Sequence, residues 1–524
     1  MFGHQSVPAT YLLNFGLNDV VSTFLAHTIQ QTTTIRDNES NRFYIDKMPH
    51  ESTVDHFLCI LCALYLDERE DTYLQRDLQL SSFFLLSPST LLLTKAIKCI
   101  KAICKSNPFG PQTFFTIQQD FIIFREQIPT PCPHIIISLL ATHTFEFSQT
   151  FDNIIALLTI VQRRRIWESE TKTMNPSMIT HPSAYGMTTD EKTTLNLLLV
   201  RFSVQSQFLV ALLAFFGFLL SSDENTFTDF LINKGILQLV GNVLTFATIS
   251  NNIVKRKTTT EEPLFQQFME THLAGLEYVR FQELQHLVPV GMPYFLPTRE
   301  QIAEDRDTFI NTDKSSFYHH FRTEVDQAIN PVVVECLFIL SNISGGTQEQ
   351  TQLVLTHTIE SEQGTSDLFF KVLNKVYEAS PRPIQHEIAI ILRNIACGSS
   401  EQKQELINSL IFLPMIIETV NEHRSVQSSD KILLEIIVLL LEEFSQIPVP
   451  ETPHQVLTPE YFCWIQFITV VQTHPFEEYL ERAQLQPKLG LGPLAKRLGR
   501  LWNFVNQNIA PQFLRNLSSS DGLD

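Results

Sequence analysis

Apolar residues along this chain gather in runs of helical length, separated by short polar or proline-containing stretches. Within the runs, leucine, isoleucine and phenylalanine recur at helical spacing, and the alternation typical of strands is scarce. The pattern predicts helices over Val54–Leu66, Leu91–Cys104, Ile135–Ala141, Phe151–Val161, Phe208–Leu220, Leu433–Phe444, Tyr461–Val471 and Pro493–Val505. We therefore expect an all-α fold.

One part of this pattern occurs twice without a gap. The segment Glu335–Leu355, ECLFILSNISGGTQEQTQLVL, recurs from Glu387 as EIAIILRNIACGSSEQKQELI, at an offset of 52 residues. In each copy an apolar helix stops at glycine, and Thr or Ser follows with Gln three positions later, which is a capping box that starts the next helix. We expect Gly345 and Gly346 to adopt the left-handed conformation that ends a helix. Repetition at such a period is typical of stacked-helix solenoids.

The repeated motif resembles the armadillo repeat of importin-α, the adaptor that binds nuclear localisation signals. It reads Glu-x-x-aromatic-x-x-x-Asn-Ile, followed by a small residue and then Gly-Thr-x-Glu-Gln. The matching places are occupied by Glu335, Phe338 and Asn342 in the first copy, and by Glu387, Ile390 and Asn394 in the second. The resemblance implies an armadillo-like right-handed superhelical solenoid in which Trp and Asn side chains line a concave groove. The family's Trp is replaced in both copies.

Weaker forms of the same pattern extend over the C-terminal two-thirds of the chain. In the segment Ser206–Val240, Ala214 falls at the family's Trp position and Phe218 at its Asn position. Further on, Glu435 and Glu442 recur at the same spacing, with Glu442 in the place of Asn. We divide the chain into a weakly structured segment over 1–53, divergent helical repeats with an inserted loop over 54–190, armadillo-like repeats over 191–512 and a loose tail over 513–524. Polar loops are expected over 28–41 and 162–183.

The repeated positions form a candidate groove for a basic peptide. Residues three and seven positions apart share one helix face, so stacked units align them in a ladder. An Asn amide can hold a peptide backbone, an aromatic ring can hold a Lys or Arg side chain, and carboxylates can pair with the cationic ends. The candidate groove residues are Glu335, Phe338, Asn342, Glu387, Ile390, Asn394, Glu435 and Glu442. Alternatively, the two Asn side chains bond to neighbouring backbone and serve packing alone.

The charge of the chain agrees with a basic partner. The formal net charge is −18, from 38 Lys and Arg against 56 Asp and Glu, and it favours basic peptides over nucleic acid. Alternatively, the charge serves solubility alone. The resemblance implies an adaptor for nuclear protein import, present in the cytoplasm and the nucleus. The alternative is an armadillo-repeat scaffold for another protein partner, without import activity. Importin-α binds importin-β through a basic N-terminal segment, whereas residues 1–50 hold only Arg36, Arg42 and Lys47, so we expect no importin-β binding there.

Other kinds of chemistry find no support in the sequence. Phosphate-binding loops, dinucleotide fingerprints and nucleophile elbows are missing, so we expect no enzymatic activity and no cofactor. His56, Cys59 and Cys62 lie at helical spacing in an apolar pattern, and we interpret them as core packing rather than a metal site. The charge-free run Phe208–Leu220 is shorter than the ~20 residues that cross a bilayer, so we expect a core helix and no membrane partner.

Overall fold

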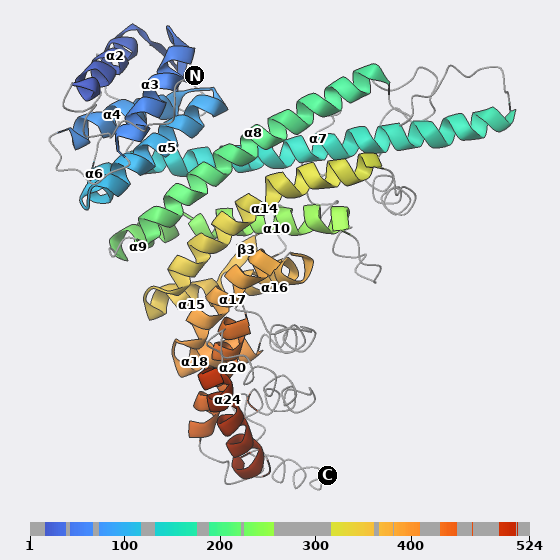
Figure 1. Ribbon diagram of the computed structural model, residues 1–524. Helices are drawn as coiled ribbons and strands as arrows, with labels where there is room; N and C mark the ends of the chain where they lie inside the picture. Colours follow the sequence, from blue (N-terminus) through green and yellow to red (C-terminus); the bar gives the residue numbers. More distant parts are fainter. Residues whose placement is uncertain are drawn as a thin grey trace, which may run out of the picture. The chain divides into compact units, whose positions relative to one another are not determined.

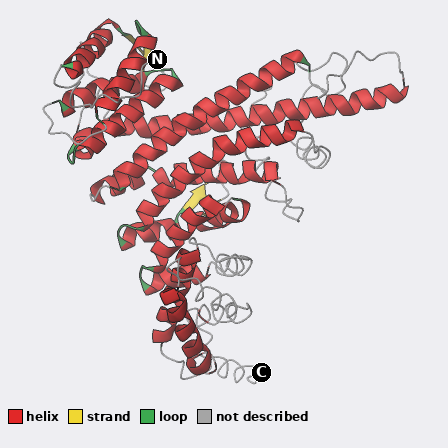
Figure 2. Cartoon of the chain, in the orientation of Figure 1, coloured by secondary structure: helices red, strands yellow, loops and turns green. Residues whose placement is uncertain are grey.

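The computed structural model describes residues 16–37, 42–65, 73–116, 132–174, 188–221, 225–255, 316–360, 366–380, 382–408, 430–447, 464, 492–509 and 511. These residues are mostly helical (Figures 1 and 2). Two short antiparallel strand pairs, β1 with β2 and β3 with β4, complete them. The all-α fold is therefore confirmed for the described part of the chain. The chain divides into two compact units, unit 1 with Met1–Leu239 and Ile253–Glu335, and unit 2 with Val240–Asn252 and Cys336–Asp524.

Unit 1 contains the N-terminal helices and one strand pair (Figure 1). Its elements are α2 (Leu17–Gln31), β1 (Thr33–Asp37), β2 (Arg42–Lys47), α3 (Glu51–Leu64), α4 (Leu74–Phe83), the 3-10 turn η1 (Phe84–Leu86), α5 (Thr90–Ser106), α6 (Gly110–Thr116), α7 (Cys132–Met174), α8 (Thr189–Leu220) and α9 (Asn225–Asn233). Parts of α10 (Ile236–Lys255) and α14 (Ser316–Ser344) also belong to it.

Unit 2 contains the repeated segment. Its elements are the remaining parts of α10 and α14, then α15 (Gln348–Thr356), β3 (Thr358–Glu360), β4 (Ser366–Leu368), α16 (Phe369–Ala379), α17 (Arg382–Ala396), α18 (Ser400–Asn408), α20 (Asp430–Gln446), α24 (Gly492–Phe504) and the π-helical turn η5 (Val505–Ile509). Helix α17 packs against α16, α18 and α20, and α20 packs against α24. The helices predicted over Leu433–Phe444 and Pro493–Val505 correspond to α20 and α24.

Helix α5 is central to unit 1 because it packs against α3, α4, α6 and α8. Its residues Ile97, Ile100 and Ile103 are fully buried, as the apolar spacing of the sequence predicted. Helices α7 and α8 run side by side (Figure 1). Their packing includes a stack of phenylalanine rings, in which the centroids of Phe147 and Phe202 lie 4.3 Å apart.

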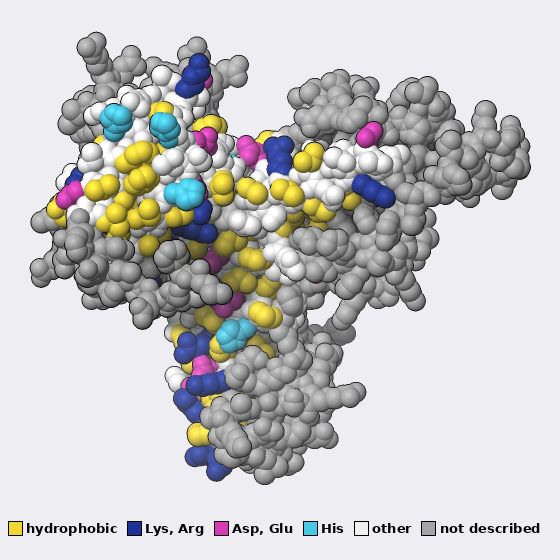
Figure 3. All heavy atoms as spheres, turned by 45° about the horizontal axis from the view of Figure 1, so that its top comes forward, with side chains coloured by type: hydrophobic (Ala, Val, Ile, Leu, Met, Phe, Trp, Pro, Cys, Tyr) yellow, Lys and Arg dark blue, Asp and Glu magenta, His cyan; other side chains and the backbone are white. Residues whose placement is uncertain are grey.

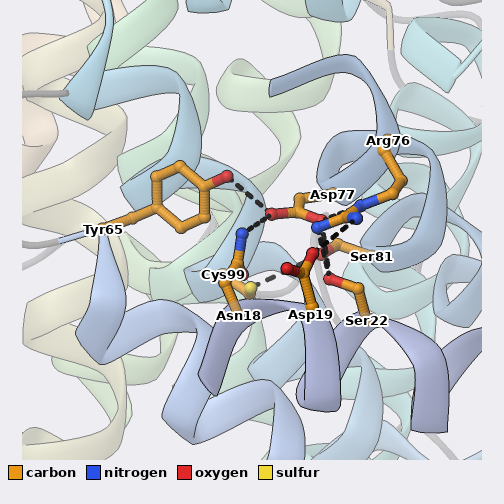
Figure 4. A network of polar contacts seen from close by, with 8 residues as sticks. All are labelled: Asn18, Asp19, Ser22, Tyr65, Arg76, Asp77, Ser81 and Cys99. Atoms are coloured by element: carbon orange, nitrogen blue, oxygen red, sulfur yellow. Dashed lines mark hydrogen bonds and ion pairs between the residues drawn. The ribbon is translucent and has the colours of Figure 1, made fainter. Parts of the chain in front are cut away.

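A buried carboxylate joins α2, α4 and the end of α3 (Figure 4). The side chain of Asp77 is fully buried in the first turn of α4. Its Oδ2 accepts hydrogen bonds from Asn18 Nδ2 at 3.1 Å and Tyr65 Oη at 2.7 Å. Its Oδ1 accepts from Ser22 Oγ at 2.8 Å and Arg76 Nε at 3.0 Å. Because both oxygens are occupied by donors from three segments, this network has a structural role in fixing them together.

The N-terminal segment has more regular structure than the sequence predicted. Residues 1–53 were expected to be weakly structured, with a polar loop over 28–41, but they contain α2 and the hairpin of β1 and β2. Val21, Leu25 and Ile29 of α2 are fully buried at four-residue spacing, which is enough for an amphipathic helix despite polar flanks. The loop prediction is wrong for the residues of α2 and β1. Residues 1–15 and 38–41 lie outside the described part.

The predicted loop over 162–183 is wrong for its first part. Helix α7 continues to Met174, so the helices predicted over Ile135–Ala141 and Phe151–Val161 are one helix. No Pro or Gly interrupts the chain between Cys132 and Met174 apart from Pro133 in the first turn, where proline is tolerated. Polar composition alone therefore did not end the helix. The rest of that predicted loop lies outside the described part, which ends at residue 174 and resumes at 188. The same holds for the tail predicted over 513–524 and, apart from Trp464, for the helix predicted over Tyr461–Val471.

Two helical stretches are long and apolar enough to cross a bilayer by composition, Thr189–Leu220 and Val325–Ser344. In the first, 67% of the apolar window is buried within the protein, as expected for a core helix. Fully buried Leu209, Leu212 and Phe215 illustrate this packing. On the face shown in Figure 3, groups of hydrophobic side chains lie beside Lys, Arg, Asp, Glu and His side chains of the described residues.

Candidate functional site

Both predicted capping boxes are present in unit 2. Thr347 N donates to Gln350 Oε1 at 3.1 Å, and Gln350 N donates to Thr347 Oγ1 at 3.3 Å, immediately before α15. Ser399 N likewise donates to Gln402 Oε1 at 3.0 Å before α18. Helix α14 ends at Ser344 and α17 at Ala396, as the repeated motif predicted. The sequence signal was sufficient here because every partner lies within three residues.

The prediction that Gly345 and Gly346 adopt the left-handed conformation is wrong, because the positive φ angles of the described glycines occur at Gly16 and Gly235. The repeated glycines are needed for space instead. A Cβ atom added at Gly346 would collide with Oε1 of the capping Gln350. Gly398 has the same relation to the capping Gln402. Glycine therefore lets the capping side chain lie against the backbone.

We expect Gly346→Ala to destabilise the start of α15 by about 1 kcal/mol, which is typical of a lost helix cap. The added methyl group would displace the amide of Gln350, which is 2% exposed. Hydrogen exchange of the α15 amides in the full chain measures the loss. In a Gln350→Ala background the same glycine substitution should cost little, because the colliding amide is gone. If Gly346→Ala destabilised α15 equally in the wild-type and Gln350→Ala backgrounds, the glycine would have a role other than making space for Gln350.

Elements that correspond at the 52-residue offset are in direct contact. Gln402 Nε2 donates to the backbone oxygen of Gln348 at 2.7 Å, which joins α18 to α15. Asn394 Nδ2 donates to the backbone oxygen of Ser341 at 3.0 Å and to Ser344 Oγ at 3.3 Å, which joins α17 to the end of α14. The side chain of Asn394 therefore has a packing contact in this structure.

The other residues of the candidate groove differ in accessibility. Phe338 of α14 has 40% of its surface exposed, whereas Asn342 of the same helix is half-buried and has contacts of its own. Glu387 and Ile390 are half-buried on α17. Glu387 makes no hydrogen bond or ion pair to the described residues. Glu335, three residues before Phe338 on α14, belongs to unit 1.

The two acidic candidates on α20 are already paired with cations of the same unit. Glu435 Oε2 accepts from Arg393 Nε of α17 at 2.6 Å, and Lys431 Nζ lies 4.0 Å from its other oxygen. Glu442 forms an ion pair with Arg497 of α24. Arg393 and Arg497 were not singled out from the sequence, because their partners Glu435 and Glu442 lie more than forty residues away. Glu435 and Glu442 therefore link neighbouring helices.

A further ion pair between helices, also missed by the sequence reasoning, joins α18 to α20. Lys403 Nζ lies 2.6 Å from Glu443 Oε2, and both side chains are less than one quarter exposed. The hydrogen bond from Lys403 lowers the pKa of Glu443 below its usual value. Position 443 follows the candidate Glu442 directly, so adjacent carboxylates on α20 serve two different neighbouring helices.

The interpretation of His56, Cys59 and Cys62 as core residues is wrong. The core face of α3 is formed by Val54, Leu58, Leu61 and Leu64 instead. His56 and Cys59 are exposed and Cys62 is half-buried. Lys95 Nζ of α5 lies 3.2 Å from Cys59 Sγ, and burial raises the pKa of the Cys62 thiol. The described residues contain no group of three or more His, Cys, Asp or Glu side chains that could hold a metal ion.

Comparison with known proteins does not assign the chain to a family. No family model matches it, and no curated protein does either. Among solved structures, it is similar to an engineered protein from the Northeast Structural Genomics Consortium, at 11% identity and a TM-score of 0.24, over 86% of this chain and 96% of that one. A likeness at this level carries no argument about fold or function.

Proposed function

We propose that this protein is a binding adaptor of the importin-α type, which holds basic peptides of the nuclear-localisation kind for nuclear protein import. In this proposal, the helices of the chain form an armadillo-like right-handed superhelix. The observation that carries the proposal is the exposed Phe338 at the aromatic position of the motif, together with Glu387, which has no partner in the described part of the chain. An exposed ring and an available carboxylate are what a Lys or Arg side chain requires.

The contacts of Asn394, Glu435 and Glu442 reduce the number of candidate residues that can bind a peptide. Asn394 donates its amide to α14, and Glu435 and Glu442 are paired with arginines. The peptide would therefore be held mainly by the ring of Phe338 and the carboxylate of Glu387. Since one ring and one half-buried carboxylate supply most of the attraction, we expect weak binding that falls steeply with salt.

Titration of a labelled Lys- and Arg-rich peptide against the full chain tests this function. We expect Phe338→Ala combined with Glu387→Gln to weaken binding about tenfold, since a cation–π contact and an ion pair that are both open to solvent on one side contribute roughly 1 kcal/mol or less each. Phe338 is 40% exposed and Glu387 is half-buried, so chemical unfolding of the double variant should accompany the titration. Glu405→Gln on α18 is the matched control, because it removes the same charge from an exposed position of unit 2. Equal affinity for wild type and the double variant would place the site elsewhere.

A second candidate is a scaffold of the same fold that binds another protein partner without import activity. The packing role of Asn394 favours it, because an amide bonded to Ser341 and Ser344 is not available to a peptide backbone. The same titration separates the two candidates. A complete absence of binding to the basic peptide at low salt would favour the scaffold.

A further inference from the structure

Helix α5 concentrates positive charge in an otherwise acidic protein. Its sequence, TLLLTKAIKCIKAICKS, contains four lysines and no acidic residue, while the whole chain carries a formal charge of −18. The lysines are at positions 95, 98, 101 and 105, which helical geometry places within an arc of about 120° and over a length of roughly 15 Å. Lys98, Lys101 and Lys105 form no ion pair with a carboxylate of the described residues.

Two of these lysines line a cleft of unit 1, which we name the α5 cleft. Its volume is about 470 Å³, within the range of roughly 300–1,000 Å³ that is usual for ligand sites. Its polar lining consists of Lys98 and Lys101 from α5, Ser203, Ser206 and Gln207 from α8, and Gln327 from α14. A hydrogen bond from Ser206 Oγ to the backbone oxygen of Ala328 joins α8 to α14 at this place.

Nearby carboxylates neutralise only part of the positive charge at the α5 cleft. Lys98 and Gln207 are exposed, and Lys101 is half-buried. Burial lowers the pKa of Lys101, and the nearby Lys105 acts in the same direction, while Glu335 opposes both. A partly desolvated ammonium group gains from an additional carboxylate, because the interaction between the two charges is less screened than in open water.

The other lining groups indicate what such a carboxylate is attached to. The amides of Gln207 and Gln327 can both donate and accept, as a peptide backbone requires. Val210, Ala211 and Ala214 provide an apolar wall for side-chain stems. We propose that the α5 cleft binds an extended acidic segment of a partner protein, whose carboxylates pair with Lys98 and Lys101.

Charge complementarity also selects against nucleic acid. A strongly anionic chain repels a long polyanion, whereas a short acidic segment interacts mainly with the local lysines. The proposed basic-peptide site uses Phe338 and Glu387 of unit 2, while the α5 cleft belongs to unit 1 and prefers the opposite charge. Either proposal can therefore fail without the other.

The test uses the full chain and a short fluorescein-labelled peptide in which Glu alternates with Ala. We expect binding that weakens with salt, and we expect Lys98→Gln combined with Lys101→Gln to lower the affinity about tenfold. Lys105→Gln is the matched control, because it removes the same charge from the same helix outside the cleft, and it should change the affinity less than about threefold. An unchanged affinity of the double variant would overturn the proposal.

Three further measurements test the kind of ligand without relying on a variant. In wild-type protein, the peptide should protect Lys98 and Lys101 from acetylation more than Lys105, as read by mass spectrometry. A peptide with Gln in place of Glu should bind much more weakly. Equal binding of the Gln peptide, equal protection of the three lysines by the Glu peptide, or tighter binding of a single-stranded oligonucleotide of the same charge would each contradict an acidic peptide as the ligand.

Discussion

Replacing Asp77 with alanine is expected to destabilise the α2–α4 region of unit 1 by about 3–5 kcal/mol. The substitution removes the acceptor for Asn18, Ser22 and Tyr65, whose side chains are each at most 3% exposed. Buried donors without an acceptor cost about 1–3 kcal/mol each. Hydrogen exchange in the full chain should show faster opening of α2 and α4, with the helices of unit 2 unchanged.

Two related substitutions make this test specific. Asp77→Asn keeps one acceptor oxygen and the size of the side chain, so its effect should be intermediate. Asp19→Asn removes only the exposed end of the same network, since Asp19 is 58% exposed, and should cost less than about 1 kcal/mol. If Asp77→Ala were no more harmful than Asp19→Asn, the buried carboxylate would not be what holds these helices together.

The substitution Phe202→Ala is expected to cost about 3–5 kcal/mol, as for other large aromatic residues removed from a core. Phe202 is 1% exposed, stacks on Phe147 at 4.3 Å and lies 5.8 Å from Phe151, measured between ring centroids. The cavity would therefore open between α7 and α8. Chemical unfolding of the full chain, combined with hydrogen exchange of α7 and α8, measures the loss.

The matched control for Phe202→Ala lies on the same helix. Leu197 is 67% exposed, so Leu197→Ala removes apolar atoms that are already in contact with water and should change stability by less than about 0.5 kcal/mol. Similar losses for the two variants would mean that α8 is stabilised by its helix propensity rather than by packing on α7.

The parts of the fold that could be predicted from the sequence are those determined by residues close to one another along the chain. The helix of Leu433–Phe444 was visible in its apolar spacing, and the capping box of Thr347 and Gln350 in its three-residue spacing. The extent of α7 was not visible, because a helix can continue through polar residues that show no periodicity. Likewise, a glycine at the end of a helix suggests a positive φ angle, whereas Gly346 provides space for the side chain of Gln350.

The candidate sites depend on contacts between distant residues, and their prediction was less complete. The sequence left Asn394 with either a packing role or a binding role, and its contact with Ser341 became known only from the packing of α17 on α14. Ala214 was assigned to a groove position, and it lines the α5 cleft. The lysines opposite it on α5 could not be connected with Ala214, because more than a hundred residues separate them in the sequence.

The two hydrogen bonds made by one glutamine side chain limit how this region can change in evolution. The oxygen of Gln402 completes the beginning of its own helix, and its nitrogen binds the backbone of Gln348 in the preceding copy. An insertion or deletion between these positions would bring a different side chain opposite that backbone and would leave the bond to Gln348 unmade. The gain or loss of a complete copy would preserve it. The region is therefore expected to tolerate changes in length mainly by whole copies.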